Sequence, residues 1–123
     1  KIIVKRSKIY NRYLYLLSQI KKNFFYIPNN FKYKYNYHAF VLILQEANRE
    51  KFLKFLKKFK INAVISYTPL HRSKFGKKFF TGRKLDNTDK YVKKIVRLPM
   101  HNYLTIKDVN YICKIIKKYF ILN

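Results

Sequence analysis

Three stretches of the chain repeat apolar residues every three or four positions, the spacing of an amphipathic helix. They predict helices over about residues 1–20, over 48–59 and from 105 to about 120. Asn48 is a good N-cap, and Thr105 with Asp108 has the spacing of a capping box. The residues expected to face the core are Ile9, Tyr13, Leu16, Leu17 and Ile20; Phe52, Leu53, Phe55, Leu56 and Phe59; and Val109, Ile112, Cys113, Ile116 and Phe120.

Short apolar runs between the predicted helices indicate strands. The runs are His38–Leu44, Ile61–Tyr67 and Val96–Pro99, and the second of them is rich in β-branched residues. Pro69 and Pro99 close these two runs, because proline lacks a donor for the next rung of a sheet. Strand-end loops often carry functional side chains, so the sequence directs attention to both loops.

The polar connections between these elements have their own signals. Pro28, Asn29 and Asn30 predict a turn after the first helix. Residues 69–86 are predicted to form a long basic loop, which leads into a short helix capped by Asn87 or Thr88. The apolar residues assigned to that helix are Tyr91, Val92 and Ile95.

This order of elements predicts a small two-layer α/β (α+β) domain, with three short strands covered by helices. A chain of 123 residues is long enough for one hydrophobic core and too short for two, so residues 1–123 are assigned to a single domain. The chain starts at Lys1 and goes directly into a helical pattern, which we interpret as a fragment that begins within an element.

Charge is the strongest feature of the composition. The chain has 29 lysines and arginines against 5 acidic residues, a formal net charge of +24, which predicts attraction to polyanions. Lysine dominates over arginine, however, and Lys, Asn, Ile, Tyr and Phe share A/U-rich codons. A basic nucleic-acid-binding module of ribosomal type and simple compositional drift both remain open. Aromatic residues interleaved with lysine could stack bases, or could line an exposed junction with another part of the protein, the interpretation we prefer; they are Phe24, Phe25, Tyr26, Tyr33, Tyr35 and Tyr37.

The sequence lacks the motifs of several kinds of structural and catalytic site. Cys113 is the only cysteine, which excludes a disulfide framework and indicates a reducing compartment such as the cytoplasm. Three histidines and five carboxylates show no zinc or calcium spacing. No nucleophile elbow or glycine-rich phosphate loop is present. The longest strictly apolar run, Ala39–Leu44, is too short to cross a bilayer.

Three residues remain as candidates for binding. His38 begins the first predicted strand and is either a core histidine or a donor at the mouth of a cleft. Tyr67 and His71 lie on either side of Pro69 and are either loop scaffolding or ligand-facing groups. No catalytic residue and no metal ligand is assigned.

Five motifs give the chain a resemblance to a known family. They are the Arg6–Ile9–Arg12–Tyr13 helix, Tyr37-His38-Ala39-Phe40, Ile61-Asn62-Ala63-Val64, Tyr67-Thr68-Pro69-Leu70-His71, and Arg97-Leu98-Pro99-Met100 followed by Leu104-Thr105. In this order and spacing they resemble the C-terminal domain of the pyridoxal-phosphate sugar-nucleotide aminotransferases of the DegT/DnrJ type. Within that family the chain looks closest to the dTDP-4-oxo-6-deoxyglucose transaminases of enterobacterial common antigen synthesis.

The resemblance implies a small C-terminal domain of an aspartate-aminotransferase-like fold, part of a homodimeric enzyme. It implies pyridoxal phosphate held mainly by a large domain outside this sequence, glutamate as amino donor and a 4-keto-6-deoxy sugar nucleotide as acceptor. No lysine here matches the Schiff-base position, so the chain alone is expected to be inactive. His38, Tyr67 and His71 would form the small-domain wall of the cleft and orient substrate.

Overall fold

The computed structural model describes residues 1–21, 23–28, 35–45 and 47–122. The predicted turn residues Asn29 and Asn30, and the aromatic Tyr33, lie outside these ranges. The elements, in chain order, are α1 (Ile2–Leu17), β1 (Phe25–Tyr26), β2 (Phe40–Leu44), α2 (Arg49–Lys58), a 3₁₀ turn η1 (Leu70–Arg72), α3 (Gly76–Phe79), α4 (Asp86–Val92), β3 (Ile95–Leu98) and α5 (Ile106–Leu122).

The strands form one antiparallel sheet in the order β1-β2-β3. Phe40 pairs with Leu98 across β2 and β3, and Phe25 pairs with Leu44 across β1 and β2. The α+β class and the three short strands covered by helices are therefore confirmed.

One of the three predicted strands was wrong. Residues 61–67 make only an isolated antiparallel bridge, from Val64 to Arg97 on the outer edge of β3. The third strand is instead the two-residue β1, within a connection that the sequence pattern had marked as polar. The 61–67 segment has the right residue types, but it leaves the sheet after one rung, so Ile65 and Tyr67 stay exposed.

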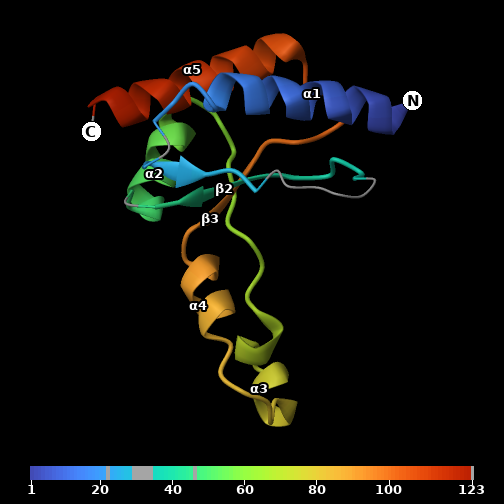
Figure 1. Cartoon of the computed structure of the whole chain (residues 1–123), viewed down its shortest axis with the longest axis vertical. Helices are drawn as coiled ribbons and strands as arrows, with labels where there is room; N and C mark the ends of the chain where they lie inside the picture. The colour runs from blue at the N-terminus through green and yellow to red at the C-terminus, as the bar shows by residue number, and fades with distance from the viewer. Residues whose placement is uncertain (22, 29–34, 46, 123) are drawn as a thin grey trace.

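Helices cover one face of this sheet. α1 and α5 run side by side across it, and α2 packs against α5 (Figure 1). Strand positions alternate in burial: Phe40, Leu42 and Leu44 are fully buried under the helices, while Val41 and Ile43 between them are only half-buried. The predicted helical stripes are confirmed as core, with Leu16, Leu53, Phe55 and Phe59 at its margin.

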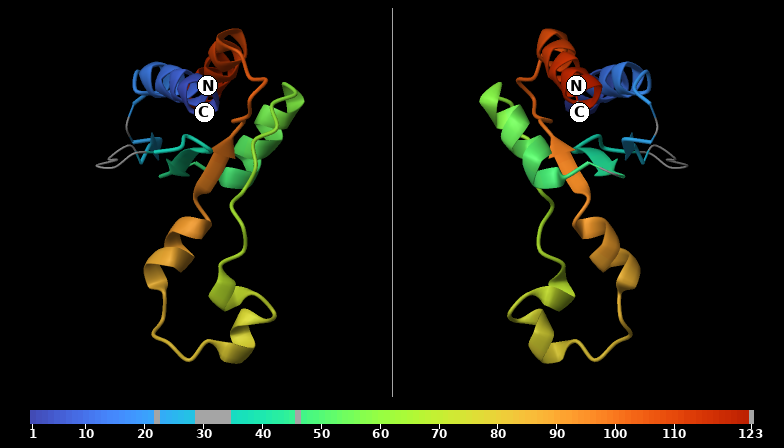
Figure 2. Two further views of the ribbon diagram at one scale, coloured as in Figure 1. Left: turned by 90° about the vertical axis from the view of Figure 1, so that its right-hand side faces the viewer. Right: turned by 90° about the vertical axis from the view of Figure 1, so that its left-hand side faces the viewer.

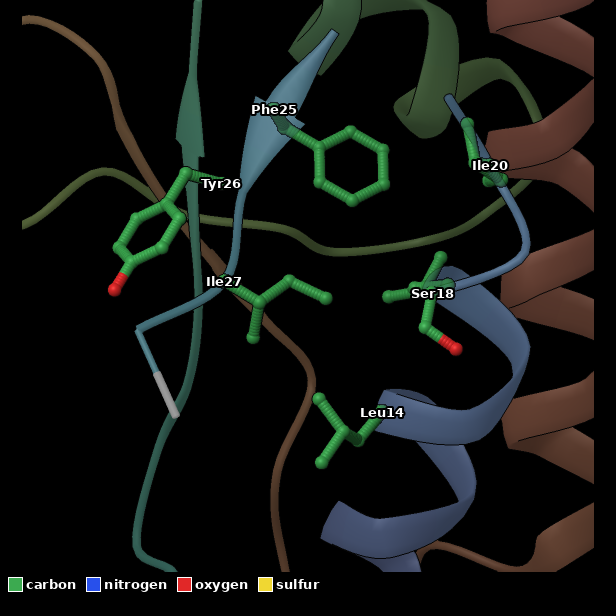
Figure 3. Close-up of a pocket in the computed structure, with 7 residues that line it drawn as sticks. Leu14, Ser18, Ile20, Phe25, Tyr26 and Ile27 are labelled. Atoms are coloured by element: carbon green, nitrogen blue, oxygen red, sulfur yellow. The ribbon is translucent and has the colours of Figure 1, made fainter. Parts of the chain in front are cut away.

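No helix among the described residues lies across the opposite face of the sheet. We call it the open sheet face and define it by Tyr26, Val41, Ile43, Ile95 and Arg97, the positions that alternate with the buried ones. Figure 3 shows the alternation at β1, where Phe25 and Tyr26 point to opposite sides of the strand. The sheet is therefore half-covered, with an apolar outer surface interrupted by one arginine.

Local capping explains where the long helices begin. The Asn48 side chain accepts a hydrogen bond from the Lys51 backbone N–H at 3.0 Å. At α5, the Asp108 carboxylate accepts from the Thr105 backbone N–H at 2.8 Å, and the Thr105 hydroxyl accepts from the Asp108 N–H at 3.2 Å. Both predicted caps are confirmed.

The cap expected for α4 was wrong. Its N-cap is Leu85, without a side-chain hydrogen bond, so Asn87 and Thr88 lie within the helix. Two acidic residues, Asp86 and Asp89, occupy the first turn instead and interact favourably with the helix dipole. Ile95 belongs to β3, not to this helix.

Residues 66–94 project from the sheet and helices as a long excursion, which we call the arm (Figure 2). It contains η1, α3 and α4, so the predicted basic loop has more regular structure than expected. Gly76 opens α3 directly against η1, where a Cβ atom would collide with the Leu70 carbonyl oxygen. Among the described residues no helix is long and apolar enough to cross a membrane.

Candidate functional site

His38 is exposed and lies just before β2. Its Nδ1 donates to the Asn36 side-chain oxygen at 2.8 Å, and its backbone N–H lies 3.2 Å from the same oxygen. Tyr37, immediately before it, has a φ of 51°, so the backbone turns sharply here. The interpretation of His38 as a core histidine is therefore wrong, and its ring faces solvent beside that of Tyr35, 6.3 Å away between centroids.

Tyr67 stands at the base of the arm with 83 % of its surface exposed. One side of its ring faces the Arg97 guanidinium, whose carbon lies 5.9 Å from the ring centroid. This distance is within the range of a cation–π contact. An exposed aromatic ring held over an arginine is available to a ligand that approaches the arm.

His71 has a different environment. It lies in η1 with only 12 % of its side chain exposed, and its Nε2 is 2.9 Å from Asp89 Oδ1 on α4. The neighbouring Arg72 donates from Nε to the same oxygen at 2.6 Å. The hydrogen bonds from Arg72 first, and then from His71, hold the pKa of Asp89 below its ordinary value. His71 therefore joins the two limbs of the arm.

Arg97 links the surroundings of Tyr67 and His38. It lies on the open sheet face of β3, and its backbone pairs with Val64 through hydrogen bonds of 2.7 and 3.0 Å. Burial raises the pKa of Tyr35, and the Arg97 charge opposes that rise, so the guanidinium is within electrostatic range of the Tyr35 hydroxyl. The site prediction missed Arg97, although a single cation in the run Ile95-Val96-Arg97-Leu98 was a visible signal.

A wide groove of about 640 Å³ lies between the two limbs of the arm. Tyr67 lines one side and Tyr91 the other, and Ile95 connects the groove to the open sheet face. Besides the two tyrosines, its polar lining residues are Ser66, Thr68, Asn87 and Thr88. His38 and His71 do not line this groove, so the three predicted residues have three different sets of neighbours.

A smaller pocket of about 230 Å³ lies between the end of α1 and β1 (Figure 3). Its walls are mainly apolar, from Leu14, Ile20 and Phe25. Ser18 is a polar group in the wall, and its hydroxyl already donates to the Tyr15 carbonyl at 2.9 Å. The lining has no charged group, so the pocket does not suit a phosphate or a carboxylate.

Metal and thiol chemistry find no support in the part of the chain that the structure describes. Its histidines, cysteine and carboxylates form no group that could hold a metal ion. Burial in α5 raises the pKa of Cys113 to about 12, so this thiol is a packing group and a poor nucleophile.

Residues 1–117 match the model of the DegT/DnrJ/EryC1/StrS aminotransferase family. The chain belongs to this family. No curated protein sequence matches it. The predicted resemblance to the family is thus confirmed, while the narrower resemblance to dTDP-4-oxo-6-deoxyglucose transaminases is not established.

Solved structures of aminotransferases share the fold at low sequence identity. PseC from Helicobacter pylori, involved in pseudoaminic acid biosynthesis, is 19 % identical with a TM-score of 0.85; the match covers 98 % of this chain and 33 % of PseC. TlmJ from Streptoalloteichus hindustanus is 17 % identical with a TM-score of 0.84, covering 98 % and 32 %. A family member from Brucella abortus is 24 % identical with a TM-score of 0.80, covering 95 % and 31 %. The chain therefore spans about a third of the length of these proteins.

Family membership implies pyridoxal phosphate, so we tested whether the described residues could hold it. A lysine that forms a Schiff base is normally desolvated, which lowers its pKa and makes it nucleophilic. Every described lysine is exposed except Lys94, which is half-buried and lies 3.4 Å from the Gln45 carbonyl oxygen. The described lysines therefore do not fit the Schiff-base position, and no chemical step of this chain is derived through the cofactor.

Proposed function

We propose that residues 1–123 are the small C-terminal domain of a pyridoxal-phosphate-dependent sugar-nucleotide aminotransferase. The enzyme would transfer an amino group from glutamate to a 4-keto-6-deoxy sugar nucleotide for cell-surface polysaccharide synthesis, such as lipopolysaccharide or enterobacterial common antigen. The open sheet face is the observation that carries the proposal. A sheet with an apolar, half-exposed face suits a domain that packs against a larger one, and the matched relatives are about three times as long.

In this proposal the chain binds and orients substrate, and the bond-making groups belong to the rest of the enzyme. Tyr67 presents an exposed ring beside the groove, and His38 presents a solvent-facing imidazole. His71 acts from within the arm, because its contact with Asp89 fixes the turn that carries Pro69 and Leu70. Such groups accelerate a reaction by holding the substrate in position.

The remaining assignments follow the same proposal. The complete enzyme would be a cytoplasmic homodimer, with the sugar nucleotide and glutamate as its ligands. The 123-residue chain alone would neither form an internal aldimine nor transfer an amino group.

The test is to purify the protein encoded by the complete reading frame and supply ¹⁵N-glutamate with dTDP-4-keto-6-deoxyglucose. We expect ¹⁵N in the sugar product and none with the 123-residue chain. A borohydride-reducible aldimine on the 123-residue chain, or a complete protein that leaves the 4-keto group unchanged while aminating another acceptor, would contradict the respective part of the proposal.

A further inference from the structure

We infer that Arg97 is an oxyanion anchor on the open sheet face, which binds a carboxylate or phosphate group of a ligand through its guanidinium. This inference rests on the proposed function and adds to it a binding residue outside the predicted set of His38, Tyr67 and His71.

Most arginines of the described chain already have an acceptor. Arg6 donates to Asn102 at 3.2 Å, Arg12 to Asn110 at 2.8 Å, Arg49 to the Val92 carbonyl at 2.6 Å, and Arg72 to Asp89 at 2.6 Å. The two arginines whose side chains have no hydrogen-bond acceptor among the described residues are Arg83 and Arg97. Arg83 is exposed on the arm, where water solvates it, whereas Arg97 is half-buried on an apolar sheet face.

None of the described carboxylates forms a hydrogen bond or ion pair with Arg97. Asp89 binds His71 and Arg72, and Asp108 caps α5. Glu50 and Asp86 lie in the first turns of α2 and α4. A guanidinium that loses water without gaining an anion is costly. The described part of the chain offers Arg97 no carboxylate, so its guanidinium is available to an anion from outside these residues.

The surroundings of Arg97 suit recognition of a planar or tetrahedral oxyanion. Val41 is its cross-strand neighbour on β2, and Val64 pairs with it on the other edge, so apolar residues flank it on both sides. The Tyr67 ring lies beside the guanidinium, 5.9 Å from its carbon to the ring centroid, and no side-chain hydrogen bond among the described residues occupies the N–H groups. A guanidinium presents two parallel donors to a carboxylate or phosphate, which a lysine cannot do.

Binding can be measured on the ¹⁵N-labelled 123-residue chain by following the arginine Nε–Hε signals by NMR. The probes are sodium glutamate and sodium pyrophosphate, each titrated at constant ionic strength. We expect a saturable shift of the Arg97 signal. Arg97→Gln should weaken binding roughly 10- to 100-fold, the range for a hydrogen bond to a charged group. Arg97→Lys keeps the positive charge but lacks the two parallel N–H donors of the guanidinium, so it should recover only part of the affinity.

Arg83→Gln is the matched control, because it removes one positive charge from an exposed site on the arm. It should change affinity less than about twofold, the behaviour of a distant screened charge. Saturation by glutamate assigns the anchor to a carboxylate; saturation by pyrophosphate alone assigns it to a phosphate. Absence of saturation with both probes, or equal losses in the Arg97 and Arg83 variants, would overturn the inference.

The failure of this inference is distinct from the failure of the proposed function. In the complete enzyme, Arg97→Gln should raise the KM for the ligand that Arg97 binds, with Arg83→Gln unchanged. If the complete enzyme is active and Arg97→Gln changes no KM value, the inference about Arg97 is overturned and the proposed function stands. If the complete protein has no transaminase activity while the separate 123-residue chain still shows Arg97-dependent saturation, only the proposed function is overturned.

Discussion

Tyr13 shows how a single buried hydroxyl joins distant parts of the chain. Its side chain is fully buried between α1 and the sheet, and its ring lies 4.8 Å from that of Phe40. The hydroxyl donates to the Pro99 carbonyl at 3.1 Å, just after the end of β3. Burial raises the pKa of this hydroxyl, so it stays protonated and continues to donate throughout the physiological pH range.

We expect Tyr13→Phe to lower the free energy of unfolding by about 1–2 kcal/mol, because the half-buried Pro99 carbonyl loses its donor. The measurement is a urea unfolding curve followed by circular dichroism. Tyr15→Phe is the control: Tyr15 is 61 % exposed on the same helix, and its removal should change stability by less than about 0.5 kcal/mol. Equal losses in both variants would contradict the assigned role of the hydrogen bond.

At the scale of elements, the end of α2 contains a strained residue. Lys60 follows the helix with a φ of 58°, in the left-handed region that favours glycine. The Lys60 N–H donates to the Lys57 carbonyl at 3.0 Å and the Ile61 N–H to the Leu56 carbonyl at 3.1 Å, which is a Schellman motif. Ile61 is buried beyond it, so the motif also anchors the next segment.

Lys60→Gly should therefore stabilise the protein by about 0.5–1 kcal/mol, since glycine adopts this conformation without a Cβ clash. Thermal unfolding of the variant measures the change. Lys58→Gly removes the same charge and side chain within the last turn of α2, where glycine should instead destabilise by about 1 kcal/mol. A lower melting temperature for Lys60→Gly would show that the left-handed conformation is not strained.

The arm has a pH-sensitive contact between η1 and α4. The folded pKa of Asp89 is lowered from its model-peptide value of 3.8 by Arg72 and His71, so the stabilisation is present above that value and is lost as the pH falls through the folded pKa. We expect the Arg72 Nε–Hε signal to shift on acidification below about pH 4. Asp89→Asn should abolish this titration.

Asp108 is the control for that titration, because hydrogen bonds from Thr105 lower its pKa in the same direction. Asp108→Asn changes the cap of α5 and leaves the arm unaltered. The Arg72 signal should titrate normally in this variant. A titration that vanishes in both variants would indicate general acid unfolding.

The elements that the sequence predicted well are those whose pattern is local. Helical periodicity identified the buried faces of α1, α2 and α5, and short polar side chains identified two of their caps. Strand pairing depends on distant partners, so Ile61–Tyr67 was mistaken for a strand and the two-residue β1 was missed. The contact of His71 with Asp89, 18 residues away, has no local signature either.

The open sheet face belongs to the whole molecule. It arises only when β1, β2 and β3 align in register, with Tyr26, Ile43 and Ile95 side by side. The sequence predicted a sheet covered by helices but gave no information on which face would remain uncovered. Arg97 was missed for the same reason: its importance depends on the missing cover and on Tyr67, which approaches from the arm.

The net charge of +24 is also a property of the whole molecule, and it bears on the alternative of a nucleic-acid-binding module. Exposed lysines are spread over several elements; they include Lys51, Lys54, Lys57 and Lys58 on α2, and Lys107, Lys114, Lys117 and Lys118 on α5. Such a distribution favours non-specific attraction to polyanions. Any binding should fall steeply with salt, since it depends on counterion release.

We therefore expect the 123-residue chain to bind a single-stranded oligonucleotide at low salt and to release it near 150 mM salt, where the Debye length is only about 8 Å. Fluorescence anisotropy against salt concentration measures this. Changing the four α2 lysines to glutamine, or the four α5 lysines, should weaken binding equally, because neither face is a dedicated site. Micromolar binding that persists at physiological salt and depends on one of the two faces would instead support a nucleic-acid-binding function.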